Sequence, residues 1–172
     1  MDLKIIDIKD KDLFTKAWSL YENSFPSIEK RSLLEQETLM NNKKYKPLAF
    51  IEDDIIIAIL FYWDFKPYSY IEHFAVNDKL RGMSYGSKIL ENFLQDKKDV
   101  ILEIELISDE ISHKRLKFYE KFDFKINEFK HYQVPFRKNQ KDLELLLLSY
   151  KRKLSFDEYK KLYSQMKESL SF

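Results

Sequence analysis

Both glycines of this 172-residue chain lie in one short segment, Arg81-Gly82-Met83-Ser84-Tyr85-Gly86. Glycine permits positive φ angles and lets a backbone approach a ligand closely. The segment follows a strand-like apolar stretch at residues 70–76 and precedes apolar residues at helical spacing between residues 89 and 94. Backbone N–H groups turned outward at the start of a helix bind anions such as phosphate. These residues alone allow two interpretations: a phosphate-binding turn, or a strand-to-helix turn without a ligand.

One carboxylate, Glu72, interrupts the strand-like stretch at residues 68–76. A carboxylate in apolar surroundings is costly unless it is paired with a cation or used in a reaction. Glu72 is therefore a candidate general base, and the alternative is a salt bridge to a Lys or Arg of a neighbouring strand. The adjacent His73 points to the opposite face of a regular strand unless a bulge redirects it. We expect His73 to be structural or to make a minor substrate contact.

The composition excludes several classes of protein. There is no cysteine, hence no thiol nucleophile and no cysteine zinc site, and the three histidines are too scattered for a metal-ligand pattern. The formal net charge of +1 argues against a nucleic-acid partner. The N-terminus lacks the apolar region of a signal peptide, and the longest uncharged apolar run, residues 55–63, is too short to span a membrane. We expect a cytoplasmic protein with no metal, membrane or nucleic-acid partner.

Hydrophobic periodicity predicts one α/β domain over residues 1–172, in which residues 151–172 form an appended C-terminal helix. Meandering strands followed by crossover helices imply a mixed, twisted sheet of about seven strands with helices on both faces. The predicted strands cover residues 3–8, 48–52, 55–63, 68–76, 100–107, 124–129 and 143–150. The predicted helices run from a cap at Asp10 or Asp12 to residue 23, over 28–40, from the glycine segment to about 96, and over 111–122 and 156–170.

This order of elements resembles the GNAT superfamily of N-acetyltransferases. In that family a strand ending in an apolar Val precedes a Gln/Arg-x-x-Gly-x-Gly/Ala segment, which opens a helix and cradles the pyrophosphate of coenzyme A. Ser84 stands where the family usually has the first glycine of the motif; its hydroxyl can cap the helix, but positive φ is costly for it. The resemblance implies coenzyme A contacts from Phe74, Ala75, Val76, Arg81, Gly82, Met83, Ser84, Tyr85, Gly86 and Ser87.

A second segment, residues 112–124, also resembles the family. Its helical tyrosine, here Tyr119, commonly protonates the departing coenzyme A thiolate, and a tyrosine can donate a proton to a thiolate formed beside it. Ser112 lies two turns earlier, where many relatives carry a cofactor-contacting asparagine. Asp123 replaces a glycine that is common after this helix. The plain alternative for Tyr119 is a core aromatic residue.

The resemblance also implies the remaining roles. Many relatives use a glutamate on the strand of Glu72 to withdraw the amine proton. The stretch Phe25 to Arg31 and the loop residues Tyr132, Gln133 and Phe136 resemble the segments that line the acceptor pocket, and the alternative for both sets is surface packing. Glu103 and Glu105 share one face of their strand, where we expect them to meet lysines. The alternatives are that they repel each other or hold a cationic substrate. The C-terminal helix either covers the sheet or contributes to a homodimer.

The implied function is an acetyl-CoA-dependent N-acetyltransferase that acts on a primary amine of a small molecule or peptide. Direct transfer in a ternary complex fits the chain, because it has no cysteine to carry the acetyl group. The first alternative is a catalytically degenerate acyl-CoA-binding module of the same fold. The second, a dinucleotide-binding enzyme, is disfavoured because no Gly-x-Gly-x-x-Gly follows the first strand.

Overall fold

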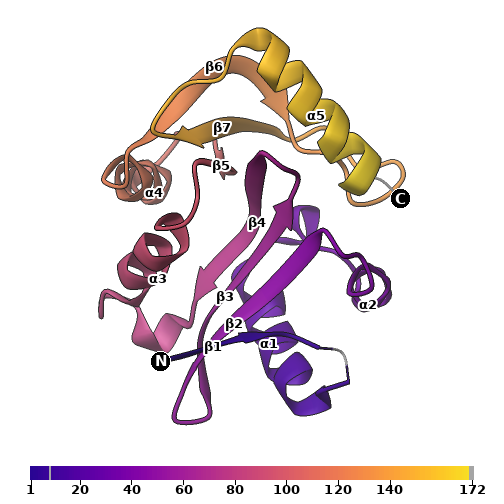
Figure 1. Cartoon of the computed structure of the whole chain (residues 1–172), viewed down its shortest axis with the longest axis vertical. Coiled ribbons are helices and arrows are strands. Elements are labelled where there is room, and N and C mark those ends of the chain that lie inside the picture. The colour runs from indigo at the N-terminus through magenta and orange to yellow at the C-terminus, as the bar shows by residue number, and fades with distance from the viewer. Residues whose placement is uncertain (8, 171–172) are drawn as a thin grey trace. The chain divides into compact units, whose positions relative to one another are not determined.

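The computed structural model describes residues 1–7 and 9–170 (Figure 1). Its helices are α1 Lys11–Ser24, α2 Leu33–Leu39, α3 Tyr85–Leu94, α4 Glu110–Glu120 and α5 Phe156–Leu170, with the 3₁₀ helices η1 Ser27–Glu29 and η2 Asp78–Leu80. Its strands are β1 Asp2–Ile5, β2 Tyr45–Glu52, β3 Ile55–Asp64, β4 Tyr68–Val76, β5 Asp99–Glu105, β6 Phe124–Tyr132 and β7 Glu144–Tyr150. Within the described residues these seven strands form one mixed sheet in the order β1-β2-β3-β4-β5-β7-β6.

The chain divides into two compact units. The first comprises Met1–Asp64 and Ile71–Asp96, and the second comprises Phe65–Tyr70 and Lys97–Phe172. No helix among the described residues is long and apolar enough to cross a membrane.

The first unit is built around the β2–β3 hairpin. Its turn residues, Asp53 and Asp54, have φ angles of 49° and 61°, as a tight hairpin turn requires. On β3, Phe61 stacks on Tyr21 of α1 at 5.7 Å between ring centroids, while the next residue, Tyr62, meets Phe93 of α3 at 5.0 Å. Adjacent strand residues point to opposite faces. The two helices therefore cover opposite faces of this part of the sheet, as the sequence predicted.

In the second unit β7 pairs antiparallel with both β5 and β6. The β6–β7 register shifts between Asn127 and His131. The buried Asn127 side chain donates to the carbonyl oxygen of Leu147 at 3.2 Å and accepts from the backbone N–H of Leu154 at 2.7 Å. This amide satisfies backbone groups where the chain leaves β7, so it fixes the entry into α5.

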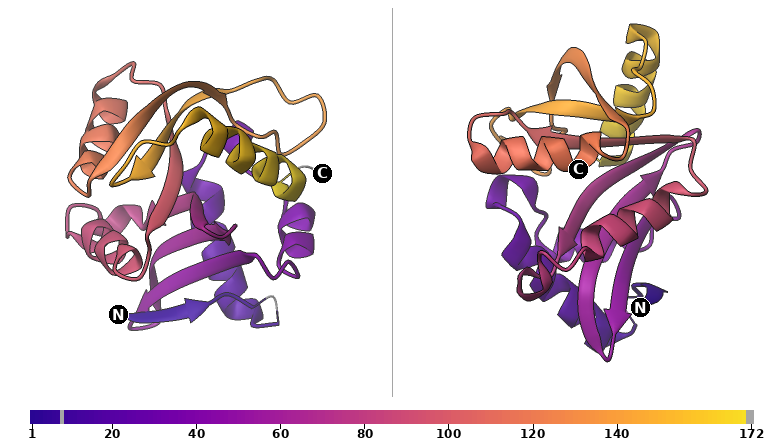
Figure 2. Two further views of the ribbon diagram at one scale, coloured as in Figure 1. Left: turned by 45° about the horizontal axis from the view of Figure 1, so that its top comes forward. Right: turned by 90° about the vertical axis from the view of Figure 1, so that its left-hand side faces the viewer.

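The C-terminal helix α5 packs on β6, with Tyr159 stacked on Phe129 at 4.8 Å (Figures 1 and 2). The Tyr159 hydroxyl lies 2.9 Å from Nδ1 of the fully buried His131, whose Nε2 lies 2.7 Å from Oε2 of Glu103. The hydroxyl of Tyr70 donates to the other oxygen of Glu103. Of the two roles predicted for this helix, it takes the first, covering the sheet of its own unit.

Several predicted boundaries were wrong. The helix expected over residues 28–40 is split into η1 and α2, because Ser32 starts α2 with a capping box in which its hydroxyl accepts from Glu35 N–H. Strand β1 ends at Ile5, and the expected end at Ile8 lies outside the described residues. Strands β2 and β6 are longer than expected, beginning at residue 45 and ending at residue 132 respectively.

The buried contact between α5 and His131 predicts a stability effect. Tyr159→Phe should lower the free energy of unfolding by about 1–3 kcal/mol, because it leaves the buried Nδ1 of His131 without its hydrogen bond. Tyr150→Phe is the matched control, since the Tyr150 hydroxyl makes no hydrogen bond among the described residues. Urea unfolding of both variants measures the difference, and equal stability of the two would show that the hydroxyl contributes nothing.

Candidate functional site

The glycine segment forms the turn before α3. Gly82 has φ +81°, and a Cβ built on it meets nothing within 4 Å, so the glycine serves the backbone angle. Ser84 adopts φ 62°, the left-handed conformation that its family position favours, and Asp123 after α4 does the same with φ 65°. Both departures from the family pattern therefore keep the glycine-like backbone. The Ser84 hydroxyl, expected to cap α3, makes no capping hydrogen bond.

Helix α3 differs from the other helices at its start. Side chains cap α1 (Asp10), α2 (Ser32), α4 (Asp109) and α5 (Ser155) by accepting from first-turn N–H groups. Among the described residues α3 has no such cap and no acid in its first turn. The first N–H groups of a helix have no partner within the helix, and the helix dipole makes that end positive. The start of α3 is thus left open to an anion.

Gly86 lies in the first turn of α3, where any residue can take the helical conformation. Glycine costs roughly 0.5–1 kcal/mol relative to alanine inside a helix. A glycine at this position leaves the backbone open to close approach by another group. Arg81 is exposed beside it, and the Tyr85 hydroxyl donates to Glu52 at 2.6 Å, which raises the pKa of Tyr85. The segment has the features of a phosphate cradle.

The other predicted cofactor residues of this unit surround the same turn. Phe74 and Val76 at the end of β4 are partly exposed, whereas Ala75 is buried. Met83 is 57% exposed and Ser87 partly exposed. Apart from Ala75, the side chains in this set are accessible from solvent.

Glu72 is part of a buried cluster on β4. Its two carboxylate oxygens accept from the two terminal nitrogens of Arg31, each at 2.5 Å. The Arg31 and Glu72 side chains are only 6% and 1% exposed. Nδ1 of His73 lies 3.4 Å from Oε2 of Glu72. The expectation that His73 lies on the opposite face was wrong, because the adjacent side chains meet in one cluster.

The ion pair changes what Glu72 can do. Burial alone would raise the pKa of Glu72, but the Arg31 charge and its hydrogen bonds, helped by His73, lower that pKa to about 2. A carboxyl group with so low a pKa is a weak proton acceptor at neutral pH. The geometry matches the salt-bridge alternative for Glu72, with a partner from the α1–α2 connection instead of a neighbouring strand. The base role stays a prediction.

Tyr119 and Ser112 lie on one face of α4, both buried. The Tyr119 ring packs edge-on against Phe124 at 5.6 Å, and burial raises the pKa of Tyr119 to about 12. Its hydroxyl makes no hydrogen bond to the described residues. The Ser112 hydroxyl, in contrast, accepts from the N–H groups of Ser108 and Asp109 within the α4 cap. Tyr119 therefore keeps a free proton donor, whereas the hydroxyl of Ser112 is already engaged.

The structure brings some of the predicted acceptor residues together. Phe25 and His73 meet in the first unit with ring centroids 4.7 Å apart. Tyr132 belongs to the second unit, where its carbonyl oxygen accepts from the Tyr163 hydroxyl at 3.0 Å. The prediction that Glu103 and Glu105 pair with lysines was wrong, because their partners are His131 and Arg115 respectively.

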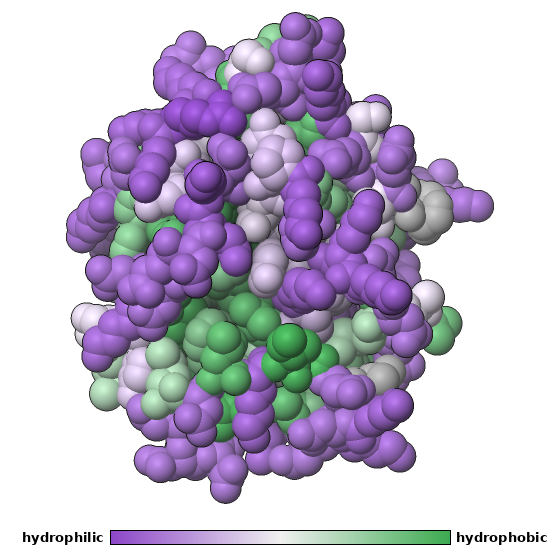
Figure 3. Space-filling view, viewed as in Figure 1, coloured by the Kyte–Doolittle hydropathy of each residue, from purple (hydrophilic) through white to green (hydrophobic). Residues whose placement is uncertain are grey.

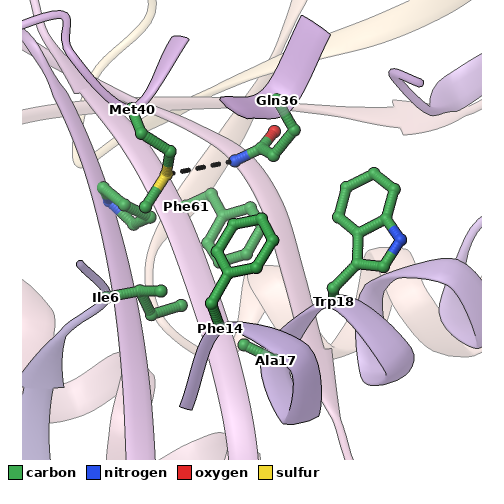
Figure 4. A pocket seen from close by; sticks show the side chains of 8 residues that line it. Ile6, Phe14, Ala17, Trp18, Gln36, Met40 and Phe61 are labelled. Atoms are coloured by element: carbon green, nitrogen blue, oxygen red, sulfur yellow. Dashed lines mark hydrogen bonds between the residues drawn. The ribbon is translucent and has the colours of Figure 1, made fainter. Parts of the chain in front are cut away.

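A small apolar pocket opens between α1, α2 and the first strands (Figure 4). It carries no ionisable side chain, and Gln36 Nε2 within it lies 3.7 Å from Met40 Sδ. None of the predicted site residues lines it. Its lining consists of Ile6, Phe14, Ala17, Trp18, Gln36, Met40, Pro47 and Phe61. Figure 3 shows a separate view of the surface, in which apolar side chains gather over the strands of the first unit on a largely hydrophilic face.

Sequence reasoning did not identify Arg31 as the partner of Glu72. The backbone N–H of Arg31 donates to the Tyr21 hydroxyl at 2.8 Å, so main chain and side chain are both held. The available signal was the unpaired charge of Glu72 in an apolar strand, which required a cation somewhere in the fold. Nothing in the spacing of residues 31 and 72 identified which cation.

The buried ion pair predicts a pH-dependent stability. The folded pKa of Glu72 lies below its ordinary 4.5, so the folded state binds fewer protons. This contribution is present above about pH 4.5 and is lost as the pH falls toward 2, on the order of 3 kcal/mol in all. Glu72→Gln should be destabilised at pH 7 and lose less stability than wild type on acidification. Urea unfolding at pH 7 and pH 3 tests this, with exposed Glu128→Gln as control; parallel losses in Glu72→Gln and wild type would contradict it.

A sequence profile described as "Acetyltransferase (GNAT) family" matches residues 11–124. The Bacillus subtilis (strain 168) protein YjbC is 27% identical over 103 residues, which are 59% of this chain and 52% of that protein. The match thus spans about half the length of that relative.

Solved structures agree in fold. A GNAT-family protein from Bacteroides thetaiotaomicron superposes with a TM-score of 0.88 at 27% identity, covering 96% of each chain. The ribosomal-protein-S18-alanine N-acetyltransferase from Escherichia coli gives a TM-score of 0.66 at 12% identity, covering 90% of this chain and 95% of that chain. An aminoglycoside 6'-N-acetyltransferase complexed with coenzyme A gives a TM-score of 0.63 at 15% identity, covering 87% of this chain and 96% of that chain. With the profile match over most of its length, the chain belongs to the GNAT acetyltransferase family.

Proposed function

We propose that this protein is an acetyl-CoA-dependent N-acetyltransferase that acts on a primary amine of a small molecule or peptide. The observation that carries the proposal is the uncapped start of α3 behind the Gly82–Ser84 turn. An exposed, positive helix end suits the pyrophosphate of coenzyme A. A structural relative carries coenzyme A in its crystal structure, which supports the same ligand here.

This chain's residues fit that ligand at several points. The N–H groups of the first turn of α3 can donate to phosphate oxygens, and Gly86 leaves their approach unobstructed. Arg81, exposed before the turn, adds a permanent positive charge. Bound acetyl-CoA supplies an acetyl thioester. Because the chain has no cysteine to carry the acetyl group, the amine takes it directly.

Tyr119 supplies the proton for the departing thiolate. A pKa of about 12 keeps its hydroxyl protonated at neutral pH, and that hydroxyl makes no hydrogen bond to the described residues. In the transfer the amine nitrogen bonds to the acetyl carbon, the carbon–sulfur bond breaks, and the sulfur takes the tyrosine proton. The amine gives up one proton, for which Glu72 or water is the acceptor. The Arg31 ion pair favours water.

A catalytically inactive acyl-CoA-binding module is the alternative. The sequence features that favoured it were Ser84 and Asp123 at family glycine positions. Both adopt the positive φ of a glycine, with values of 62° and 65°. The turn geometry thus gives no reason for lost activity, and the enzyme stays the preferred proposal.

Acetyl-CoA should raise the melting temperature of the wild-type protein, since a ligand at 100 times its Kd adds about 2.7 kcal/mol to stability. Gly86→Val should abolish that rise, because its side chain blocks approach to the first turn of α3. Glu91→Val is the matched control on an exposed position of the same helix and should keep the rise. Differential scanning fluorimetry at millimolar acetyl-CoA measures it, and an unresponsive wild type would remove the proposed cofactor.

Tyr119→Phe should keep the fold and the acetyl-CoA response, because the ring packing remains and no protein hydrogen bond is lost. Its kcat should fall by at least about tenfold, equivalent to roughly 1.4 kcal/mol in the barrier. Thiol release with an aminoglycoside, a polyamine and a peptide amine gives kcat, and fluorimetry on the same preparation gives stability. Unchanged kcat would exclude Tyr119 from the mechanism. Thermal stabilisation by acetyl-CoA without turnover on any amine would favour the binding module.

A further inference from the structure

The connection between α1 and α2, residues 25–32, is held by three buried contacts within the first unit. The Arg31 guanidinium makes a two-point ion pair with Glu72, with both distances at 2.5 Å. The Arg31 backbone N–H donates to the Tyr21 hydroxyl at 2.8 Å. Nε2 of His73 lies 2.7 Å from the carbonyl oxygen of Glu29. Side chains of β4 and α1 thus hold the backbone at two nearby positions of one short connection.

The His73 contact has a defined direction. A backbone carbonyl only accepts, so Nε2 of His73 carries the hydrogen and donates to Glu29. Nδ1 then faces the Glu72 carboxylate at 3.4 Å. The rings of Tyr21 and Phe25 pack edge-on against the imidazole at 4.8 and 4.7 Å. His73 therefore fills the space between the carboxylate and the connection.

The cluster engages both oxygens of the carboxylate that would act as the general base. Oε1 of Glu72 accepts from one Arg31 nitrogen, while Oε2 accepts from the other and faces His73. The Glu72 side chain is 1% exposed. In this environment the Glu72 carboxylate holds the Arg31 guanidinium in place, and neither of its oxygens is directed at solvent.

We propose that Glu72, Arg31 and His73 are positioning residues that hold residues 25–32 in one conformation, and that they determine acceptor affinity through this segment and not by proton abstraction. The acceptor part rests on the proposed function and on the expectation from the sequence that Phe25 lies at the acceptor pocket. The segment has little regular structure of its own, since η1 comprises three residues. The cluster therefore contributes directly to fixing its conformation.

The two roles of Glu72 predict different kinetics. A positioning role predicts that Arg31→Gln and Glu72→Gln raise the acceptor KM by at least tenfold, with kcat within about threefold and the acetyl-CoA KM unchanged. Because each variant breaks the same contact, the double variant should be no worse than the worse single variant. A general base predicts instead a kcat loss of about 10²–10⁴-fold in Glu72→Gln alone, which shrinks as the pH rises.

Hydrogen exchange of the full chain tests the positioning role without any substrate. In Arg31→Gln and Glu72→Gln the amides of residues 29–32 should exchange at least tenfold faster, while those of α3 stay unchanged. Glu52→Gln, which removes the exposed acceptor of Tyr85 in the same unit, is the matched control and should leave residues 29–32 as in wild type. Arg31→Lys keeps the positive charge but loses the two-point geometry, so the exchange rate of residues 29–32 should increase less than in the glutamine variants. This variant also serves as the test if the glutamine variants do not fold.

The kinetic arm uses kanamycin, spermidine and a peptide with a free N-terminus as probe amines. Unchanged exchange at residues 29–32 in all three variants would overturn the proposal, and so would a pH-rescued kcat loss confined to Glu72→Gln. If wild type releases no thiol with any probe amine and gains no stability from acetyl-CoA, the proposed function fails. The exchange measurement then still decides whether the cluster positions residues 25–32.

Discussion

The ion pair between Arg31 and Glu72 is the constraint on which much of the first unit depends. A carboxylate in a buried strand needs a cation within hydrogen-bond distance, and removal of one partner of such a pair typically costs about 3–5 kcal/mol. Arg31 lies in the non-helical connection between η1, which ends at Glu29, and α2, which Ser32 caps. The ion pair is thus formed at the point where the expected second helix is divided into η1 and α2.

At the start of α3, in contrast, the backbone N–H groups have no side-chain partner among the described residues. The other four described helices use a side chain to satisfy first-turn N–H groups, which is worth about 1 kcal/mol in each case. Helix α3 lacks this contribution and follows a serine held at positive φ, itself costly by roughly 1–2 kcal/mol. Strain and unsatisfied donors in one segment point to a function that needs both. The function that we propose for this segment is binding of coenzyme A.

In the second unit the buried carboxylate of Glu103 has a tyrosine hydroxyl and a histidine as its partners. Glu103 accepts from Tyr70 and contacts His131, and His131 in turn contacts Tyr159 of α5. Each member has a partner, so the network joins β4, β5, β6 and α5 without an exposed charge. Such satisfied polar networks favour one arrangement of the elements over alternatives that would leave a group unpaired. They explain why a C-terminal helix with only a narrow apolar stripe stays in a defined place.

The sequence alone predicted most of the fold, because apolar periodicity and turn residues act locally. The hairpin at Asp53–Asp54 and the bounds of β4 and α5 follow from patterns within a few residues. The motifs around Gly82–Gly86 and Tyr119 were sufficient to indicate the family, since their chemistry also depends on local spacing.

Tertiary structure decided the partners of the buried charges. Arg31 and Glu72 are 41 residues apart, and His131 and Glu103 are 28 apart. No local pattern selects one cation among the thirty Lys and Arg residues of the chain. The choice depends on which side chain the packed elements bring within about 3 Å of the carboxylate. For the same reason the sequence identified Glu72 as chemically important, but only the fold showed that its charge is neutralised by Arg31.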